Sequence, residues 1–343
     1  MSRGTERPAP TADDAASVAT SAAAEALRRP LALAGAPQPL PLGFGTDAFR
    51  CRLVGAPDPL WSGRLVVRVA AHAEEAAAED AWHRWADGQG YPTPRVLATW
   101  TGGPHGLVLA DPGLEPSIDQ MARDLAGLPA LIGSLGRLQA RLHSEPTGAA
   151  PGPVLDWAAA LDRLDAKLAG AGAAGAEPEM RSQRAWLGAH DPGPVAPVPC
   201  HGDFTPLNIH LDPADARAAV VASWAGAFLS DREFDLAASH LALWSSPYAA
   251  PDRGHRRLLK MARAAVIAGY EAGYRANGAE PDDRRMASWG AYHACWFSLV
   301  TATAPVAGAE ATGWSPADLA KVRAGYRKDL AKRFAVLAAE AGR

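Results

Sequence analysis

The chain has 343 residues, of which 48% are hydrophobic and 21% are charged, and its formal net charge is −3. This is the composition of an ordinary globular protein, and the length suggests about two domains or lobes. The near-neutral charge gives no electrostatic support for binding nucleic acid or an anionic membrane. No apolar stretch approaches the roughly 20 residues of a membrane span, and the N-terminus lacks a signal-peptide core. We therefore expect a cytoplasmic protein with no nucleic-acid or membrane partner.

The three cysteines, Cys51, Cys200 and Cys295, are far apart in the sequence and have no metal-ligand spacing. This pattern indicates free, buried thiols in a reducing compartment. Cys200 is next to the motif described below, where burial is a better interpretation than use as a nucleophile.

The N-terminal part of the chain divides into a tail and a helix. Residues 1–10 are polar and rich in proline, and we expect a disordered tail there. Residues 11–35 contain a predicted helix over 11–29, which opens on the capping sequence Thr11-Ala12-Asp13-Asp14, followed by a linker. This helix is expected to cover the sheet of the next segment or to meet a partner.

Residues 36–109 have the pattern of a small lobe built from strands and one helix. Two glycines, Gly43 and Gly45, are spaced so that a backbone turn could lie close over phosphates, although a plain hairpin turn would use the same residues. Residues 64–69 form a predicted β-branched strand that carries a cation, Arg68, which a surface edge strand could also carry.

The helix predicted over residues 73–87 supplies a candidate partner for this cation. Glu79 follows Arg68 by eleven residues and is the preferred ion-pair partner, with Glu75, one turn earlier on the same face, as the second choice. A solvated acidic helix face is the alternative interpretation.

After an apolar strand over residues 106–112, the pattern becomes helical to the end of the chain. The predicted helices are 131–143, 154–169, 178–187, 255–276, 284–303 and 315–339. An antiparallel sheet with one helix, followed by a mostly helical region over 110–343, predicts an α+β fold.

The chemically most informative stretch is VPCHGDFTPLNIH, residues 198–210. It places Asp203 five residues before Asn208, the spacing that phosphoryl transfer of the protein-kinase class uses. There, an aspartate accepts the hydroxyl proton and an asparagine holds Mg²⁺ on the phosphates. Both are also ordinary turn residues, so the motif needs support from the rest of the chain.

Several further motifs provide that support. They are G-x-P-x-P-x-V-L at 90–97, a Leu-His pair at 142–143 and D-L-A at 235–237. Together with HGD-x-x-x-x-N at 201–208 they resemble the aminoglycoside phosphotransferase and choline-kinase-like family, over roughly residues 40–340. The resemblance implies a bilobal, protein-kinase-like fold in which ATP or GTP binds with Mg²⁺.

The resemblance also implies roles for individual residues. Asp203 would be the catalytic residue and Asn208 a metal ligand. Arg68, braced by Glu79, would clamp the phosphates together with the Gly43–Gly45 turn. Backbone groups between Leu109 and Asp111 would bind the base. His201 and Asp235 would have structural roles beside the site.

One position departs from the family pattern. The family has an aspartate that chelates Mg²⁺ directly before a tryptophan, where this chain has Ser223 before Trp224. A serine hydroxyl is a poor substitute for a carboxylate on a hard cation, so the metal site is degenerate. We expect Val220 to Trp224 to run as a buried strand that presents Ser223 to the metal position.

Two functions follow as hypotheses. The first is an ATP-dependent phosphotransferase that acts on a hydroxyl of a small molecule or of a peptide Ser or Thr. The second is a kinase-fold pseudoenzyme that serves as a scaffold or recognition subunit for a partner protein, for example in the biosynthesis of ribosomal-peptide natural products. The first is favoured because Arg68, Glu79, Asp203 and Asn208 are all retained.

Overall fold

The computed structural model describes residues 10–40, 48–123, 127–175, 177–212, 219–246, 253–277, 280–303 and 316–343. The chain divides into two compact units, one of Met1–Ser117 with Leu207–Ala227 and the other of Ile118–Pro206 with Phe228–Arg343. The first contains an antiparallel sheet and the second is mostly helical, which confirms the predicted α+β class. Within the described residues, no helix is both long and apolar enough to cross a membrane.

The first unit is built on a six-stranded antiparallel sheet with the order β1-β3-β4-β6-β5, in which β2 also pairs with β3. Its strands are β1 (Ala32–Leu33), β2 (Gln38–Pro39), β3 (Ala48–Val54), β4 (Arg64–Ala70), β5 (Val96–Trp100) and β6 (His105–Ala110), and its helices are α1 (Ala12–Leu27), α2 (Pro59–Ser62) and α3 (Ala73–Gly88). The segment expected as a linker therefore contributes a strand, because β1 pairs with β3.

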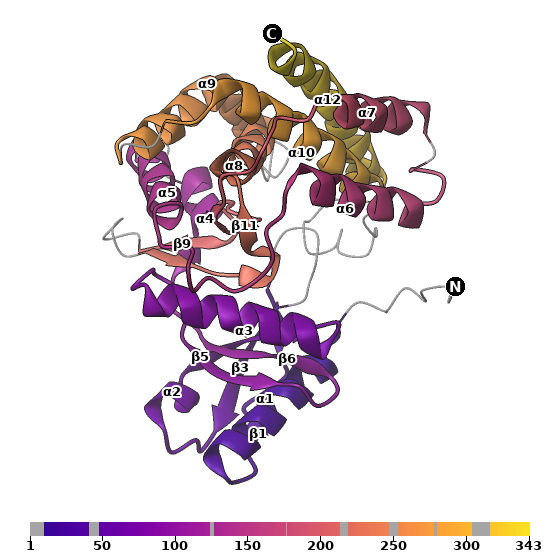
Figure 1. Ribbon diagram of the computed structural model, residues 1–343. Helices are drawn as coiled ribbons and strands as arrows, with labels where there is room; N and C mark the ends of the chain where they lie inside the picture. Colours follow the sequence, from indigo (N-terminus) through magenta and orange to yellow (C-terminus); the bar gives the residue numbers. More distant parts are fainter. Residues whose placement is uncertain are drawn as a thin grey trace. The chain divides into compact units, whose positions relative to one another are not determined.

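The two long helices cover opposite faces of this sheet (Figure 1). Side chains alternate along a strand, so Leu65, Val67 and Val69 of β4 face the small side chains of α1. Val66 and Ala70 point the other way, into the apolar cluster beneath α3. Arg68 lies between these two residues at even spacing, so its side chain is on the same face of the strand and points toward α3.

Helix α1 begins at the predicted cap. The Thr11 side chain accepts from the Asp14 amide, and the Asp14 carboxylate accepts from the Thr11 amide at 2.9 Å. This reciprocal pair satisfies two amides that a helix N-terminus otherwise leaves open. The expectation that the helix covers the sheet is confirmed.

The first unit also contains a small sheet with the order β10-β9-β7, made of β7 (Glu115–Pro116), β9 (Ile209–Leu211) and β10 (Ala219–Val221). The 3₁₀ turn η1 (Trp224–Gly226) follows β10 and packs on α3. The segment that carries Asn208 and Ser223 thus belongs to the sheet-containing unit.

The second unit is a helical assembly with one short ladder. Its elements are α4 (Ser117–Arg123), α5 (Leu128–Leu142), α6 (Trp157–Gly170), α7 (Pro178–Ala189), β8 (Val198–Cys200), β11 (Phe228–Ser230), α8 (Arg232–Ser245), α9 (Arg253–Arg275), α10 (Asp283–Thr303) and α12 (Pro316–Ala341). Helix α5 packs on α9, and α10 packs on both α8 and α12. Aromatic side chains form much of the core, where Trp289 contacts Trp157 and Phe234 edge-on.

Candidate active site

The first element of the site is an ion pair in the sheet-containing unit. Arg68 Nε lies 2.9 Å from Glu79 Oε1, and the two residues are only 7% and 3% exposed. The prediction that their charged groups come within salt-bridge reach is confirmed. Glu75, the second choice, instead accepts a hydrogen bond from the Ala71 amide at 3.0 Å.

The surroundings keep this pair charged. Burial raises the pKa of Glu79, but the Arg68 guanidinium and His83 more than offset it, so the pKa lies below its ordinary value. His83 is itself held in place, because its Nδ1 lies 2.7 Å from the Thr93 hydroxyl. Arg68 therefore faces a fixed carboxylate rather than solvent.

The second element is the turn that carries the family's metal position. The Ala222 amide donates to the Asn208 carbonyl at 2.8 Å, and Asn208 is 4% exposed. Ser223 then adopts the left-handed conformation, with φ 68° and ψ 65°. The prediction of a buried strand from Val220 to Trp224 is wrong beyond Val221, because the chain leaves the strand in this left-handed residue.

Trp224 fixes this turn in the core. It is fully buried, its Nε1 donates to the Val221 carbonyl at 3.0 Å, and its ring stacks on Trp82 of α3. Tyr91 meets the same ring edge-on. The aromatic contacts hold η1 against the helix that also carries Glu79.

The donor set at this turn does not fit Mg²⁺. Asn208 offers an amide oxygen and Ser223 a hydroxyl, both neutral, whereas Mg²⁺ in proteins usually takes one or two carboxylates besides phosphates and water. The left-handed backbone at Ser223 is one that aspartate and asparagine adopt more readily than other non-glycine residues. The backbone thus suits the family's acid, but the side chain does not.

The third element is the HGD loop of the helical unit. It follows β8 and turns at Gly202, whose φ of 77° is accessible to glycine without strain. The Asp203 amide donates to His201 Nδ1 at 3.3 Å, and the Asp203 carbonyl accepts from the Thr205 amide at 2.9 Å. His201 is fully buried, whereas Asp203 is exposed.

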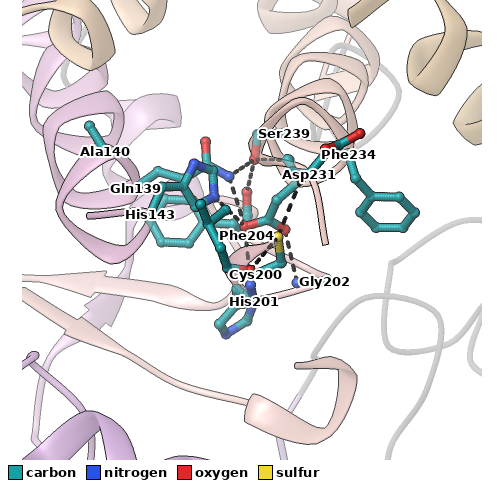
Figure 2. Close-up of polar contacts among 12 residues, drawn as sticks. Gln139, Ala140, His143, Cys200, His201, Gly202, Phe204, Asp231, Phe234 and Ser239 are labelled. Carbon is teal, nitrogen blue, oxygen red and sulfur yellow. Dashed lines mark hydrogen bonds and ion pairs between the residues drawn. The ribbon is translucent and has the colours of Figure 1, made fainter. Parts of the chain in front are cut away.

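A buried carboxylate organises this loop, and its hydrogen-bond partners Gln139, His143, His201 and Gly202 are labelled in Figure 2. Asp235, in the first turn of α8, accepts from the amides of His201 at 3.1 Å and Gly202 at 2.8 Å. It also accepts from Gln139 Nε2 at 3.1 Å and His143 Nε2 at 3.2 Å, both on or next to α5. These contacts agree with the bracing role expected for Asp235.

The donors also determine the charge of this carboxylate. Burial raises the pKa of Asp235, but the hydrogen bond and charge of His143, together with His201, bring it below its usual value. Asp235 is therefore ionised at neutral pH, and each of its four hydrogen bonds is charge-assisted.

Gln139, Ser239 and Tyr274 are parts of this network that sequence reasoning missed. The Ser239 hydroxyl lies 2.8 Å from the Phe204 carbonyl, and the Tyr274 hydroxyl lies 2.7 Å from His143 Nδ1. One signal was available: polar pairs four residues apart, such as Gln139 and His143, occupy one helix face that is otherwise apolar.

The residues assigned to the base are already engaged. Leu109 is 2% exposed and pairs with Val66 inside the sheet. The Asp111 carboxylate binds Arg50 Nε at 2.7 Å, and the Asp111 amide donates to the Arg64 carbonyl at 3.0 Å. The assignment of this segment to the base remains a prediction, and the Asp111 amide is not free to serve it.

Two other sets of predicted residues have simple outcomes. Gly43 and Gly45 lie outside the described residues. Cys51, Cys200 and Cys295 are free and buried, as expected, and burial raises the pKa of all three thiols. Cys200 is therefore a packing residue, although it lies directly before the HGD loop.

Comparison with known proteins places this geometry in a family. The model of the phosphotransferase enzyme family, APH, matches residues 36–289. The chain belongs to this phosphotransferase enzyme family. No curated protein sequence matches the chain.

Solved structures of phosphotransferases and kinases share the fold. An aminoglycoside-3′-phosphotransferase of type VIII is 20% identical, with 79% of this chain and 97% of that one covered at a TM-score of 0.55. Choline kinase LicA from Streptococcus pneumoniae is 12% identical, with 88% of this chain and 93% of that one covered at a TM-score of 0.56. Macrolide 2′-phosphotransferase MphH from Brachybacterium faecium is 21% identical, with 90% of this chain and 96% of that one covered at a TM-score of 0.51.

Because the chain belongs to the phosphotransferase family, the serine at position 223, where an acidic metal ligand was predicted, bears on whether the protein can bind metal. The chain retains the Arg68–Glu79 pair and the HGD loop braced by Asp235, yet it lacks the acidic metal ligand. The predicted phosphate-binding pair and the predicted catalytic loop are thus each formed within their own unit, and position 223 has a hydroxyl where an acid was predicted.

Proposed function

We propose that this phosphotransferase-family protein transfers the γ-phosphoryl group of ATP or GTP to a hydroxyl group of a small molecule. The observation that carries the proposal is the buried Arg68–Glu79 pair. A buried ion pair contributes little to stability relative to well-packed apolar residues, so its presence favours a functional role over a purely structural one. A guanidinium held by a carboxylate is pre-organised to bind phosphate oxygens.

The remaining roles follow from the HGD loop. Asp203 is an exposed carboxylate on a loop whose two preceding amides are held by Asp235. Such a carboxylate can orient the acceptor hydroxyl and take its proton as the phosphoryl group transfers. Because the Asn208 and Ser223 oxygens do not fit Mg²⁺ by themselves, this proposal assigns no step to a metal.

Two acidic residues at α6 have partners within the fold. Asp165 pairs with Arg184 through two contacts of 2.6 Å. Asp156 caps α6 by accepting from the Ala159 amide at 2.8 Å. These two carboxylates thus have roles within the fold, and the acceptor screen includes neutral small alcohols beside cationic ones.

The experiment is a calorimetric titration of ATP and of GTP, each with and without Mg²⁺, into the wild type and Ser223→Asp. The left-handed backbone at 223 accommodates aspartate, so the substitution should restore a metal ligand without a change of fold. We expect Mg²⁺-dependent nucleotide affinity to rise by at least about tenfold. Ser62→Asp, which adds the same charge at an exposed position of the same unit, should leave affinity unchanged.

A second candidate function is favoured by Ser223 itself. A family member without the acidic ligand could serve as a nucleotide-independent scaffold or recognition subunit for a partner enzyme or peptide. In that case Ser223→Asp would gain no nucleotide affinity. Negligible binding in all the titrations would lead us to abandon the phosphotransferase proposal in favour of the scaffold.

A further inference from the structure

A cavity of about 540 Å³ lies within the helical unit, between α8, α9, α10 and α12. It lies on a different side of α8 from the HGD loop. Asp235 and Ser239, one turn apart, face the loop, whereas His240 and Trp244, also one turn apart, line the cavity. Its volume falls within the range of about 300–1,000 Å³ that is typical of small-molecule sites.

Both arginines and acids line the cavity, namely Arg275, Arg284, Arg333 and Arg343 with Glu271, Asp283 and Glu340. Two of the arginines differ in their ion pairs, because the charge of Arg275 is countered by Glu271 at 3.3 Å and Glu280 at 3.1 Å. For Arg333, no carboxylate comes within ion-pair distance in the part of the chain that the structure describes. Burial lowers the pKa of Arg333, and Glu340 only partly opposes this.

A histidine beside these arginines adds an unused hydrogen-bonding atom. His240 Nδ1 lies 3.6 Å from a Glu271 oxygen, and Nε2 is buried without a hydrogen-bond partner among the described residues. Burial, then the charges of Arg333 and Arg275, lower the pKa of His240 to about 4. The ring is therefore neutral, and Arg333 is the charged neighbour of His240 that has no carboxylate at ion-pair distance among the described residues.

The rest of the lining includes an apolar floor. It is formed by Leu241 of α8, Met286, Ala287 and Gly290 of α10, and Leu337 of α12. A Cβ atom at Gly290 would lie 3.1 Å from the Leu337 side chain, so glycine leaves space at this point of the floor. The cavity thus combines an apolar floor with a polar wall, called the cationic wall below for Arg275 and Arg333.

We propose that this cavity binds a small organic oxyanion, a carboxylate or phosphate carried on a short apolar chain. The guanidinium of Arg333 would bind the oxyanion beside His240, and the chain would lie on Leu241 and Leu337. The ligand would supply the contact ion pair that Arg333 does not make with Glu340 or another carboxylate of the described residues, and the apolar body would be removed from water. Such a site is separate from the proposed phosphoryl-transfer machinery.

The test uses four probes of matched length: hexanoate, hexyl phosphate, hexanol and hexylammonium, each titrated calorimetrically into the full chain. We expect hexanoate or hexyl phosphate to bind at least about tenfold more tightly than hexanol, and hexylammonium to bind weakest. The comparison of the two anions identifies the preferred oxyanion. If neither anion binds better than hexanol, the proposal is refuted.

The matched variants are Arg333→Gln and Lys332→Gln. Each removes one positive charge from α12, but Lys332 is 68% exposed and does not line the cavity. Arg333→Gln should weaken anion binding at least about tenfold, and Lys332→Gln should leave it nearly unchanged. Equal effects of the two substitutions would contradict a role for Arg333.

A second readout needs no variant of the cationic wall. In protein labelled with ¹³C at the methionine methyl groups, the anion should shift the Met286 resonance in the cavity and leave that of Met261, which is 74% exposed on α9, in place. Assignment by Met286→Leu identifies the signal. An unshifted Met286 resonance at saturating anion would also refute the proposal.

Discussion

Replacement of Asp235 by asparagine would test how the HGD loop is held. The Oδ2 atom of Asp235 accepts from His201, Gln139 and His143, whereas Oδ1 accepts from the Gly202 amide. The best asparagine orientation keeps its oxygen at the three-donor position. Its NH₂ group then faces the Gly202 amide, so two buried donors meet and neither has an acceptor.

The expected destabilisation can be worked from these contacts. Two buried donors left unsatisfied cost about 1–3 kcal/mol each. Three charge-assisted hydrogen bonds become neutral ones, and since charged ones are roughly twice as strong, this loses about 1 kcal/mol apiece. Relaxation around the site favours the lower end of the resulting range, so we expect the free energy of unfolding to fall by about 5–6 kcal/mol, a large part of the stability of a typical domain.

The assay is urea denaturation followed by tryptophan fluorescence and near-UV circular dichroism. The control is Asp156→Asn, which makes the same chemical change at the exposed N-cap of α6 in the same unit. Asparagine caps helices as well as aspartate, so this variant should lie within about 0.5 kcal/mol of the wild type. If Asp235→Asn is no more destabilising than Asp156→Asn, the network does not hold the loop and our reasoning is refuted.

Three further predictions follow. The fold lowers the pKa of Asp235, so the ionised carboxylate stabilises the folded state fully above its unfolded pKa of about 3.9. This stabilisation is lost as the pH falls through the folded pKa. The difference in urea midpoint between the wild type and Asp235→Asn should therefore become smaller below about pH 4. Glu79→Gln should destabilise the protein by about 3 kcal/mol and weaken ATP binding in calorimetry, because it leaves the buried Arg68 charge unpaired, whereas the exposed Glu74→Gln should do neither. A Cβ at Gly136 would lie 2.1 Å from the Tyr270 carbonyl oxygen, so Gly136→Ala should separate α5 from α9 and lower the melting temperature, with a loss of about 1–3 kcal/mol; an unchanged melting temperature would contradict the close helix approach.

The parts of the site that could be predicted are those encoded by short-range spacing. Arg68 and Glu79 are eleven residues apart, on a strand and the helix that follows it, and this local order is enough to bring them together. The HGD loop and its asparagine are likewise contiguous in the chain. Helix α1 could be predicted from its cap and its small apolar residues, because both act within a few residues.

Other features depend on packing between distant segments. Asp235 receives its side-chain donors from Gln139 and His143, which precede it by 96 and 92 residues, and only the packing of the helices brings them within reach. Ser223 adopts a left-handed backbone directly before Trp224, whose ring is buried against Trp82 of α3, and this contact between distant segments is not contained in the local strand pattern.

The sequence by itself determined the family, the α+β class, the change from strands to helices along the chain and the missing acid at position 223, because periodicity, caps and contiguous motifs are properties of neighbouring residues. Only the tertiary structure decided which carboxylate holds the HGD loop, that the Asp111 amide is already engaged, and that Arg333 and His240 line one cavity. The reason is that hydrogen bonding and burial of these groups depend on contacts between residues far apart in the chain, which a pattern in one sequence does not contain.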